Sequence, residues 1–232
     1  MVVAHPDDVD FGAAGTVATW VDEGIDVSYC LVTDGDAGGS DLAVARSDMV
    51  DIRRAEQTEA AAVLGVQTLV FLGYPDGRVV PSLDLRRDLS RVIRQLRPDR
   101  VLTQSPERNF ERIYVSHPDH LATGEATLCA VYPDARNPFA HPELAAEGLA
   151  AHSVAEVWLM VGAGSGPSES VVTVDITRML DAKLAALRCH TSQMGPVSDI
   201  DGLIRGWTAA TAEAAGLPSG RFAESFRVID TA

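Results

Sequence analysis

The sequence predicts an α/β fold, built as a mostly parallel sheet flanked by helices and contained in a single domain. Strand-like and helix-like segments alternate along most of the 232 residues, and this alternation is typical of βαβ units. Neither internal repeats nor a low-complexity linker interrupts the pattern. Hydrophobic residues make up 46% and charged residues 22% of the chain, which suits a protein that buries its own core. We therefore expect residues 1–232 to form one domain.

Short apolar segments predict the strands of this sheet. The first covers only three residues, fewer than the roughly five or six of an average strand. It ends directly at a polar loop, as a buried strand should. The strands are expected at residues 2–4, 26–33, 67–72, 100–103, 155–161, 171–174 and 226–229.

Between the strands, apolar residues recur with helical spacing. Gly65 follows the longest of these segments and predicts where that helix ends. Helices are expected at residues 13–23, 46–64, 84–96, 118–131 and 176–190, with a short one near 207–215. Residues 132–152 contain three prolines and no clear periodicity, so we expect a loop there.

The charge balance disfavours several classes of function. The 33 acidic residues outnumber the 19 basic ones and give a net charge of −14, whereas nucleic-acid binders carry a basic surface. No apolar run approaches the roughly 20 residues that span a bilayer, and no signal-peptide pattern opens the chain. The three cysteines are far apart and predict reduced thiols rather than a disulfide framework. These features predict a cytoplasmic protein without nucleic-acid partners.

Two histidine-rich motifs carry the chemistry. The tetrapeptide HPDD at residues 5–8 follows the first strand, and SHPDH at residues 116–120 lies between a strand and a helix. Open α/β sheets bind their ligands at such positions. His5, Asp8 and His120 would give two imidazoles and one carboxylate, a donor set typical of catalytic zinc.

Each motif alone has simpler interpretations. A single His-Pro-Asp sequence usually marks only a turn, and two histidines with one carboxylate also describe the triad of non-haem iron oxygenases. A non-catalytic binding domain is a third alternative. The presence of Asp7 and His117 beside the expected ligands argues against it, because metal binding alone needs neither residue.

The segments AHPDDVDFGAAGT and SHPDH together resemble the PIG-L/LmbE-like family of zinc-dependent N-deacetylases. The resemblance extends over nearly the whole chain, through the segments at residues 53–56, 64–66, 72–77, 132–136 and 190–193. It implies a Rossmann-like fold. Family members act in mycothiol, bacillithiol and glycosylphosphatidylinositol biosynthesis, on chitobiose and on glycopeptide antibiotics.

The resemblance also implies a role for each matching residue. The zinc ligands of the family match His5, Asp8 and His120. Asp7 matches the general base, His117 matches the histidine that supports the oxyanion, and Asp119 matches the carboxylate beside that histidine. Another divalent metal such as Fe²⁺ would suit the same donors.

Two further residues are expected to bind the substrate because they match the family. Without the resemblance, Arg53 would be a solvated helix residue and Asp76 a simple turn residue. The first motif departs from the family at Val9, where glutamate is more frequent. Val115 replaces a tyrosine of the mycothiol-pathway deacetylases, which weakens that substrate assignment.

The expected activity is hydrolysis of an N-acyl bond, with an N-acetylated amino sugar as the small-molecule substrate. Asp7 would take a proton from a water that zinc acidifies to a pKa of about 7, and either Asp7 or His117 could return a proton to the amine. An amidase acting on a thiol conjugate is the alternative. His190 is expected to cap a helix, and the sequence leaves a homo-oligomer open.

Overall fold

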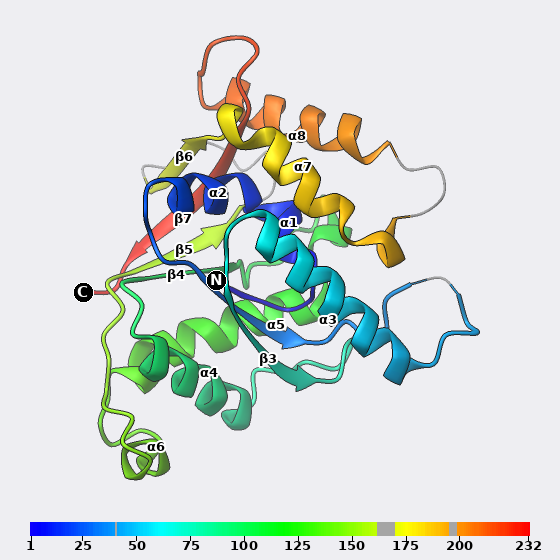
Figure 1. Ribbon diagram of the computed structural model, residues 1–232. Coiled ribbons are helices and arrows are strands. Elements are labelled where there is room, and N and C mark those ends of the chain that lie inside the picture. Colours follow the sequence, from blue (N-terminus) through cyan, green and yellow to red (C-terminus); the bar gives the residue numbers. More distant parts are fainter. Residues whose placement is uncertain (40, 162–169, 195–198) are drawn as a thin grey trace.

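The protein is described by a computed structural model that covers residues 1–39, 41–161, 170–194 and 199–232. Its centre is a seven-stranded sheet in the order β3-β2-β1-β4-β5-β7-β6 (Figure 1). The strands are β1 (Val2–Val3), β2 (Ser28–Thr33), β3 (Thr68–Tyr74), β4 (Arg100–Gln104), β5 (Glu156–Met160), β6 (Val171–Asp175) and β7 (Ala223–Asp230).

All neighbours from β3 to β5 are parallel, whereas β7 runs antiparallel to both β5 and β6. The predicted α/β class with a mostly parallel sheet is therefore confirmed. The antiparallel strand β7 extends the expected segment at residues 226–229 in both directions.

The helices lie on both faces of the sheet. They are α1 (Asp8–Gly12), α2 (Ala14–Asp22), α3 (Arg46–Val63), α4 (Leu83–Leu96), α5 (Pro118–Cys129), α6 (Pro142–Ala146), α7 (Leu180–Arg188) and α8 (Ile200–Ala214). Short turns complete the set: η1 (Ile113–Val115), η2 (Ala130–Ala135), η3 (Thr177–Met179) and η4 (Thr191–Gln193). Helix α8 is longer than the segment expected near 207–215. Residues 132–152, expected as a loop, contain α6 and most of η2.

Alternating side chains of the central strands build two cores. Val3 and Leu31 pack against α2, α3 and α7 on one face, while Val2 and Cys30 pack against α4 and α5 on the other. This division follows from the two-residue period of a strand, which sends neighbours to opposite faces. Both faces are covered, as a parallel sheet requires.

The order of strands places a switch point at β1. The chain moves outward from β1 to β2 and β3, and then returns to the other side of β1 to form β4. Crevices outside the carboxyl ends of strands at such a point are the usual ligand sites of open α/β sheets. The two histidine motifs follow β1 and β4, so they flank this crevice.

Candidate metal centre and active site

Three histidines gather at the carboxyl edge of β1 and β4. His5 follows β1, while His117 is the N-cap of α5 and His120 lies in its first turn. The ring centroid of His5 lies 4.9 Å from that of His117 and 5.2 Å from that of His120. Pro118 starts the helix, a position where its missing N–H costs nothing. The predicted approach of the two motifs is thus observed.

The three expected metal ligands lie within contact distance of one another. Asp8 Oδ1 lies 3.0 Å from His120 Nε2, which is itself 3.3 Å from His5 Nδ1. His5 Nδ1 lies 3.4 Å from the other oxygen of Asp8. Two ligand atoms at zinc bond lengths and tetrahedral angles are about 3.3–3.4 Å apart. The separations and the donor types therefore fit a divalent ion between these side chains.

The ligand atoms also form two other groups in which all donors lie within 4.8 Å. One combines His5 with His117 and His120, and the other combines His5 with Asp76 and Asp119. The second group faces the far nitrogen of His5, because Nε2 lies 3.2 Å from both Asp76 Oδ1 and Asp119 Oδ2. These carboxylates orient the His5 ring so that Nδ1 is left for a metal, an arrangement common around metal-binding histidines.

Charges around His5 and Asp8 favour their ionised forms. Burial opposes a charge on His5, but hydrogen bonds to Asp119, Asp76 and Asp8 outweigh it and raise the pKa of His5 to about 12. Burial likewise opposes the charge on Asp8, but His120 and His5 hold the pKa of Asp8 well below its ordinary value. A metal ligand must be a neutral imidazole, so an ion would compete with the proton on His5.

Asp119 has partners other than the one expected. We expected its carboxylate to lie against His117, but it binds His5 instead and accepts hydrogen bonds from Gly77 N at 2.7 Å and Val79 N at 3.1 Å. His117 Nδ1 accepts from the backbone N–H of Asp119 at 3.2 Å. The helix N-terminus therefore fixes the His117 tautomer, and a neutral ring carries its hydrogen on Nε2.

The surroundings of His117 favour its neutral form. Burial and the neighbouring His5 and His120 lower the pKa of His117. Its Nε2–H remains free to donate a hydrogen bond, and the ring lies next to those of His5 and His120.

Asp7 occupies an unusual backbone conformation. Its φ of 85° lies in the left-handed region, which residues other than glycine adopt rarely. Its carboxylate accepts a hydrogen bond from Arg53 Nη2 at 3.1 Å, and its N–H donates to Gln57 Oε1 at 2.8 Å. Burial and then the charge of Asp8 raise the pKa of Asp7 to about 6, against the opposing effect of Arg53.

Both residues that were expected to bind the substrate, Arg53 and Asp76, contact other residues of the site. Arg53 is 2% exposed and donates to Pro6 O as well as to Asp7. The Asp76 carboxylate contacts His5 Nε2 and accepts from Ala37 N. Asp36 accepts in turn from Asp76 N. The turn at residues 34–39 and the loop at residues 75–77 are therefore joined by two hydrogen bonds.

Sequence reasoning missed a buried polar group behind Asp7. Gln57, Asp10 and His190 lie in one hydrogen-bonded chain, and all three are fully buried. The expected cap role of His190 is wrong, because its Nε2 binds the Asp10 carboxylate at 2.8 Å. Lys183, the only lysine of the chain, is buried beside them. That single lysine was the one signal in the sequence.

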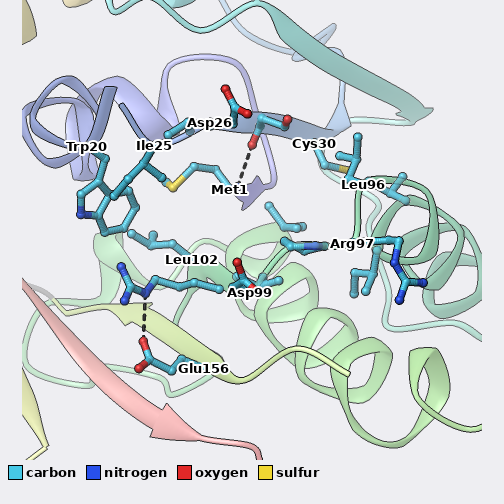
Figure 2. Close-up of a pocket in the computed structure, with 18 of the residues that line it drawn as sticks. Met1, Trp20, Ile25, Asp26, Cys30, Leu96, Arg97, Asp99, Leu102 and Glu156 are labelled. Carbon is cyan, nitrogen blue, oxygen red and sulfur yellow. Dashed lines mark hydrogen bonds and ion pairs between the residues drawn. The ribbon is translucent and has the colours of Figure 1, made fainter. Parts of the chain in front are cut away.

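A cavity of about 640 Å³ lies at the opposite, amino edge of the same strands (Figure 2). Its walls include Met1, Trp20, Leu96 and Leu102, with the ion pair between Arg100 and Glu156 at its margin. No histidine lines this cavity. It therefore lacks the chemistry of the carboxyl edge, and we place the candidate site at the histidine cluster despite the volume of this cavity.

An open α/β sheet that carries two imidazoles, a carboxylate and a nearby acid at its switch point is typical of metal-dependent hydrolases. The comparison with known families agrees with this class. The chain belongs to the PIG-L family of N-deacetylases, because the family model described as GlcNAc-PI de-N-acetylase matches residues 1–131. The predicted family membership is thus confirmed.

Relatives of known activity act on N-acetylated amino sugars. The diacetylchitobiose deacetylase of Thermococcus kodakarensis is 33% identical over 189 residues, which are 82% of this chain and 67% of that protein. A probable N-acetyl-α-D-glucosaminyl L-malate deacetylase of Bacillus cereus is 29% identical over 91% of this chain and 90% of its own length.

Among solved structures, the N,N′-diacetylchitobiose deacetylase of Pyrococcus horikoshii, in complex with an inhibitor, has the same fold. It superposes with a TM-score of 0.88 and 30% identity, over 99% of this chain and 82% of that one. In the described part of this chain, no helix combines the length and the apolar character needed to cross a bilayer. All three cysteines are free thiols, as expected.

Proposed function

We propose that this protein is a zinc-dependent hydrolase that removes the acetyl group from the nitrogen of an amino sugar. One observation carries the proposal. The donor atoms of His5, Asp8 and His120 lie as far apart as the ligands of one metal ion, at the switch point of the sheet. Asp7, directly before Asp8 in the sequence, supplies a further carboxylate. Membership of a family of N-deacetylases supports the same reaction.

The three ligands suit zinc, although Fe²⁺ accepts the same donors. Zinc bound by these side chains would supply an acidified water and polarise the amide carbonyl. The far side of His5 is held by Asp119 and Asp76, so this ring is fixed before any ion arrives. Such outer partners raise the basicity of the ligand and keep it oriented.

Asp7 is the proposed general base. A carboxyl whose pKa is raised to about 6 is ionised at neutral pH and still accepts a proton readily. Arg53 holds one of its oxygens, so the carboxylate keeps a fixed direction. We therefore propose that Arg53 acts on the substrate through Asp7, and that Asp76 acts through His5, instead of binding the substrate directly.

His117 is proposed to stabilise the transition state. Attack on an amide places negative charge on the carbonyl oxygen, and a neutral ring with hydrogen on Nε2 can donate to that oxygen. Because Nδ1 is occupied by the helix N-terminus, the ring needs no rearrangement to do so. After the attack, Asp7 returns the proton that it took as base to the departing amine, because a neutral His117 has no proton to spare.

The experiment is a screen for amine and acetate release from N,N′-diacetylchitobiose and from simpler N-acetylglucosamine glycosides, with metal content measured on the same sample. We expect equal amounts of free amine and acetate from at least one amino sugar. Release of amine only from thiol conjugates would favour the amidase alternative. A metal-loaded protein that cleaves neither class would contradict the proposal.

A further inference from the structure

The backbone of Asp7 is held in a conformation that residues other than glycine adopt rarely, although aspartate tolerates it better than most. Its φ of 85° and ψ of −25° are left-handed, and such a conformation persists only where the surroundings impose it. With this backbone conformation, the Asp7 side chain contacts Arg53 while Asp8 faces His120. Whatever holds this peptide therefore also places the proposed base.

A chain of hydrogen bonds through the core reaches the Asp7 peptide. Asp7 N donates to Gln57 Oε1 at 2.8 Å, and Gln57 Nε2 donates to Asp10 Oδ2 at 3.0 Å. The same Asp10 oxygen lies 2.8 Å from His190 Nε2. These residues come from α3, α1 and the segment after α7, which are distant in sequence.

The end of α1 is fixed as well. Lys183 Nζ donates to Asp10 O at 2.9 Å and to Phe11 O at 2.7 Å, and it pairs with Glu224 at 2.7 Å. Glu224 in turn accepts from Thr16 N at the start of α2. Helix α1 is thus held at both ends, and Asp7 lies directly before it.

Stability alone does not account for this chain. Asp10 Oδ1 and His190 Nδ1 are buried and have no hydrogen-bond partner among the described residues. A buried polar group that is only partly satisfied is less stable than an apolar replacement of the same shape. Asp10 and His190 therefore lower the stability of the fold, and their connection to the proposed base Asp7 explains their presence better than stability does.

We propose that Gln57, Asp10 and His190 are positioning residues that hold the Asp7 peptide in its left-handed conformation and so keep the base directed at the site. This inference rests on the proposed function of Asp7 as the base. All three are fully buried, and their side-chain hydrogen bonds go to one another and to the Asp7 N–H rather than to donor atoms of the expected metal ligands. Their effect on turnover passes through the Gln57 side chain to the Asp7 N–H.

The first test is Gln57→Leu, which keeps the volume and removes the acceptor for Asp7 N–H. We expect kcat to fall by on the order of 10- to 100-fold, since a small misplacement of a reacting group has effects of that size. KM should change by less than about threefold and zinc content should stay at wild-type level, because the ligands are untouched. Hydrogen exchange at the Asp7 amide, followed by NMR, should accelerate by on the order of 10-fold or more.

The second test compares two replacements of His190. His190→Gln keeps a donor that can reach Asp10, whereas His190→Phe keeps a ring without any donor. We expect His190→Gln to retain most of the turnover and His190→Phe to behave like Gln57→Leu. If both variants lost turnover equally while folded, the hydrogen bond to Asp10 would not be the property that matters.

Two controls separate positioning from general damage. Thr208→Val removes a buried hydrogen bond to Ile204 O on α8, far from the site, and should leave kcat unchanged. The amide of Ala13, bonded to Val9 O within α1, should exchange at its wild-type rate in Gln57→Leu. Faster exchange at both Ala13 and Asp7 would mean that α1 unfolds, and the positioning role would be overturned.

The amide exchange also separates this inference from the proposed function. A wild-type protein that releases no amine would overturn the function, while exchange at Asp7 in Gln57→Leu would still decide whether Gln57 holds this peptide. Faster exchange with unchanged kcat in an active enzyme would overturn the positioning role and leave the function intact.

Discussion

The two edges of the sheet differ in what they gather. At the carboxyl edge, imidazoles and carboxylates converge around His5, and both nitrogens of its ring contact them. At the amino edge, a cavity of about 640 Å³ is bounded mainly by apolar side chains and the stems of long ones (Figure 2). The amino edge therefore offers a cavity that no histidine lines, whereas the carboxyl edge carries the reactive chemistry.

The difference follows from the direction of the strands. Parallel strands send all their carboxyl ends to one edge, so loops distant in sequence, such as those after β1 and β4, meet there. The amino edge receives the ends of α2 and α4 instead and closes around Trp20 and Leu96. Substitutions at the two edges should therefore have different consequences, which the following variants examine.

The largest effect is expected for His120→Ala. Losing one of three ligands should remove stoichiometric zinc and reduce turnover to background, while the fold is retained because His120 is partly exposed. Elemental analysis and circular dichroism measure both. His152→Ala is the matched control, since the His152 ring bonds Pro98 O near the other edge and the variant should retain zinc. Full zinc occupancy in His120→Ala would show that the ligand assignment is wrong.

The next largest effect is expected for Asp7→Asn. Asparagine tolerates the left-handed conformation and keeps the shape, but it cannot accept the proton. Turnover should fall by on the order of 10²–10⁴, the usual contribution of a general base, with zinc content unchanged. Steady-state kinetics on the zinc-loaded variant measures this. Wild-type turnover would remove Asp7 from the mechanism.

Asp119→Asn tests the partner that the structure gives to His5. Asparagine keeps one of the two oxygens that accept from the backbone of residues 77 and 79, and it loses the charge beside His5 Nε2. Metal affinity should weaken by on the order of 10- to 100-fold, as is usual for such outer partners. Turnover at saturating zinc should stay within a few fold of wild type. Competition with a fluorescent chelator measures the affinity.

His117→Ala gives the complementary result. It should lower kcat by on the order of 10²–10³, the effect of removing one transition-state donor, with metal affinity unchanged. If Asp119→Asn instead reproduced this pattern, its carboxylate would act through His117, as the sequence alone suggested.

The smallest effect on turnover is expected at the amino edge. Leu102→Ala removes a buried side chain that packs with Trp158 and Phe226 and lines the cavity. It should lower the free energy of unfolding by about 2–5 kcal/mol while kcat and zinc content stay at wild-type level. Urea denaturation and kinetics measure the two quantities. A loss of kcat above tenfold in the folded variant would connect this edge to the reaction.

Local patterns predicted much of this architecture. The apolar runs located the seven strands of the sheet, and the helix expected at residues 118–131 begins at Pro118, as α5 does. The convergence of the two motifs followed from parallel strands. The antiparallel direction of β7 was not predictable, because the apolar pattern of its four expected residues does not show which strand pairs with them or in which direction.

The partners of individual side chains were also beyond the sequence. Asp119 turned to His5, 114 positions away, and to the backbone of residues 77 and 79. Gln57 reached Asp10 from α3, and His190 reached it from the segment after α7. Such contacts depend on how helices pack on the sheet, and neither periodicity nor short motifs record that packing.

The most direct test of the whole account is zinc titration of the chelator-stripped wild-type protein, with amine release from N,N′-diacetylchitobiose as the readout. Because one ion between His5, Asp8 and His120 should complete the site, activity should rise linearly and level off at one equivalent of zinc per chain. Amine release that is unaffected by stripping the metal, or that never appears at any zinc ratio, would contradict the assignment of the carboxyl edge as a metal-dependent deacetylase site.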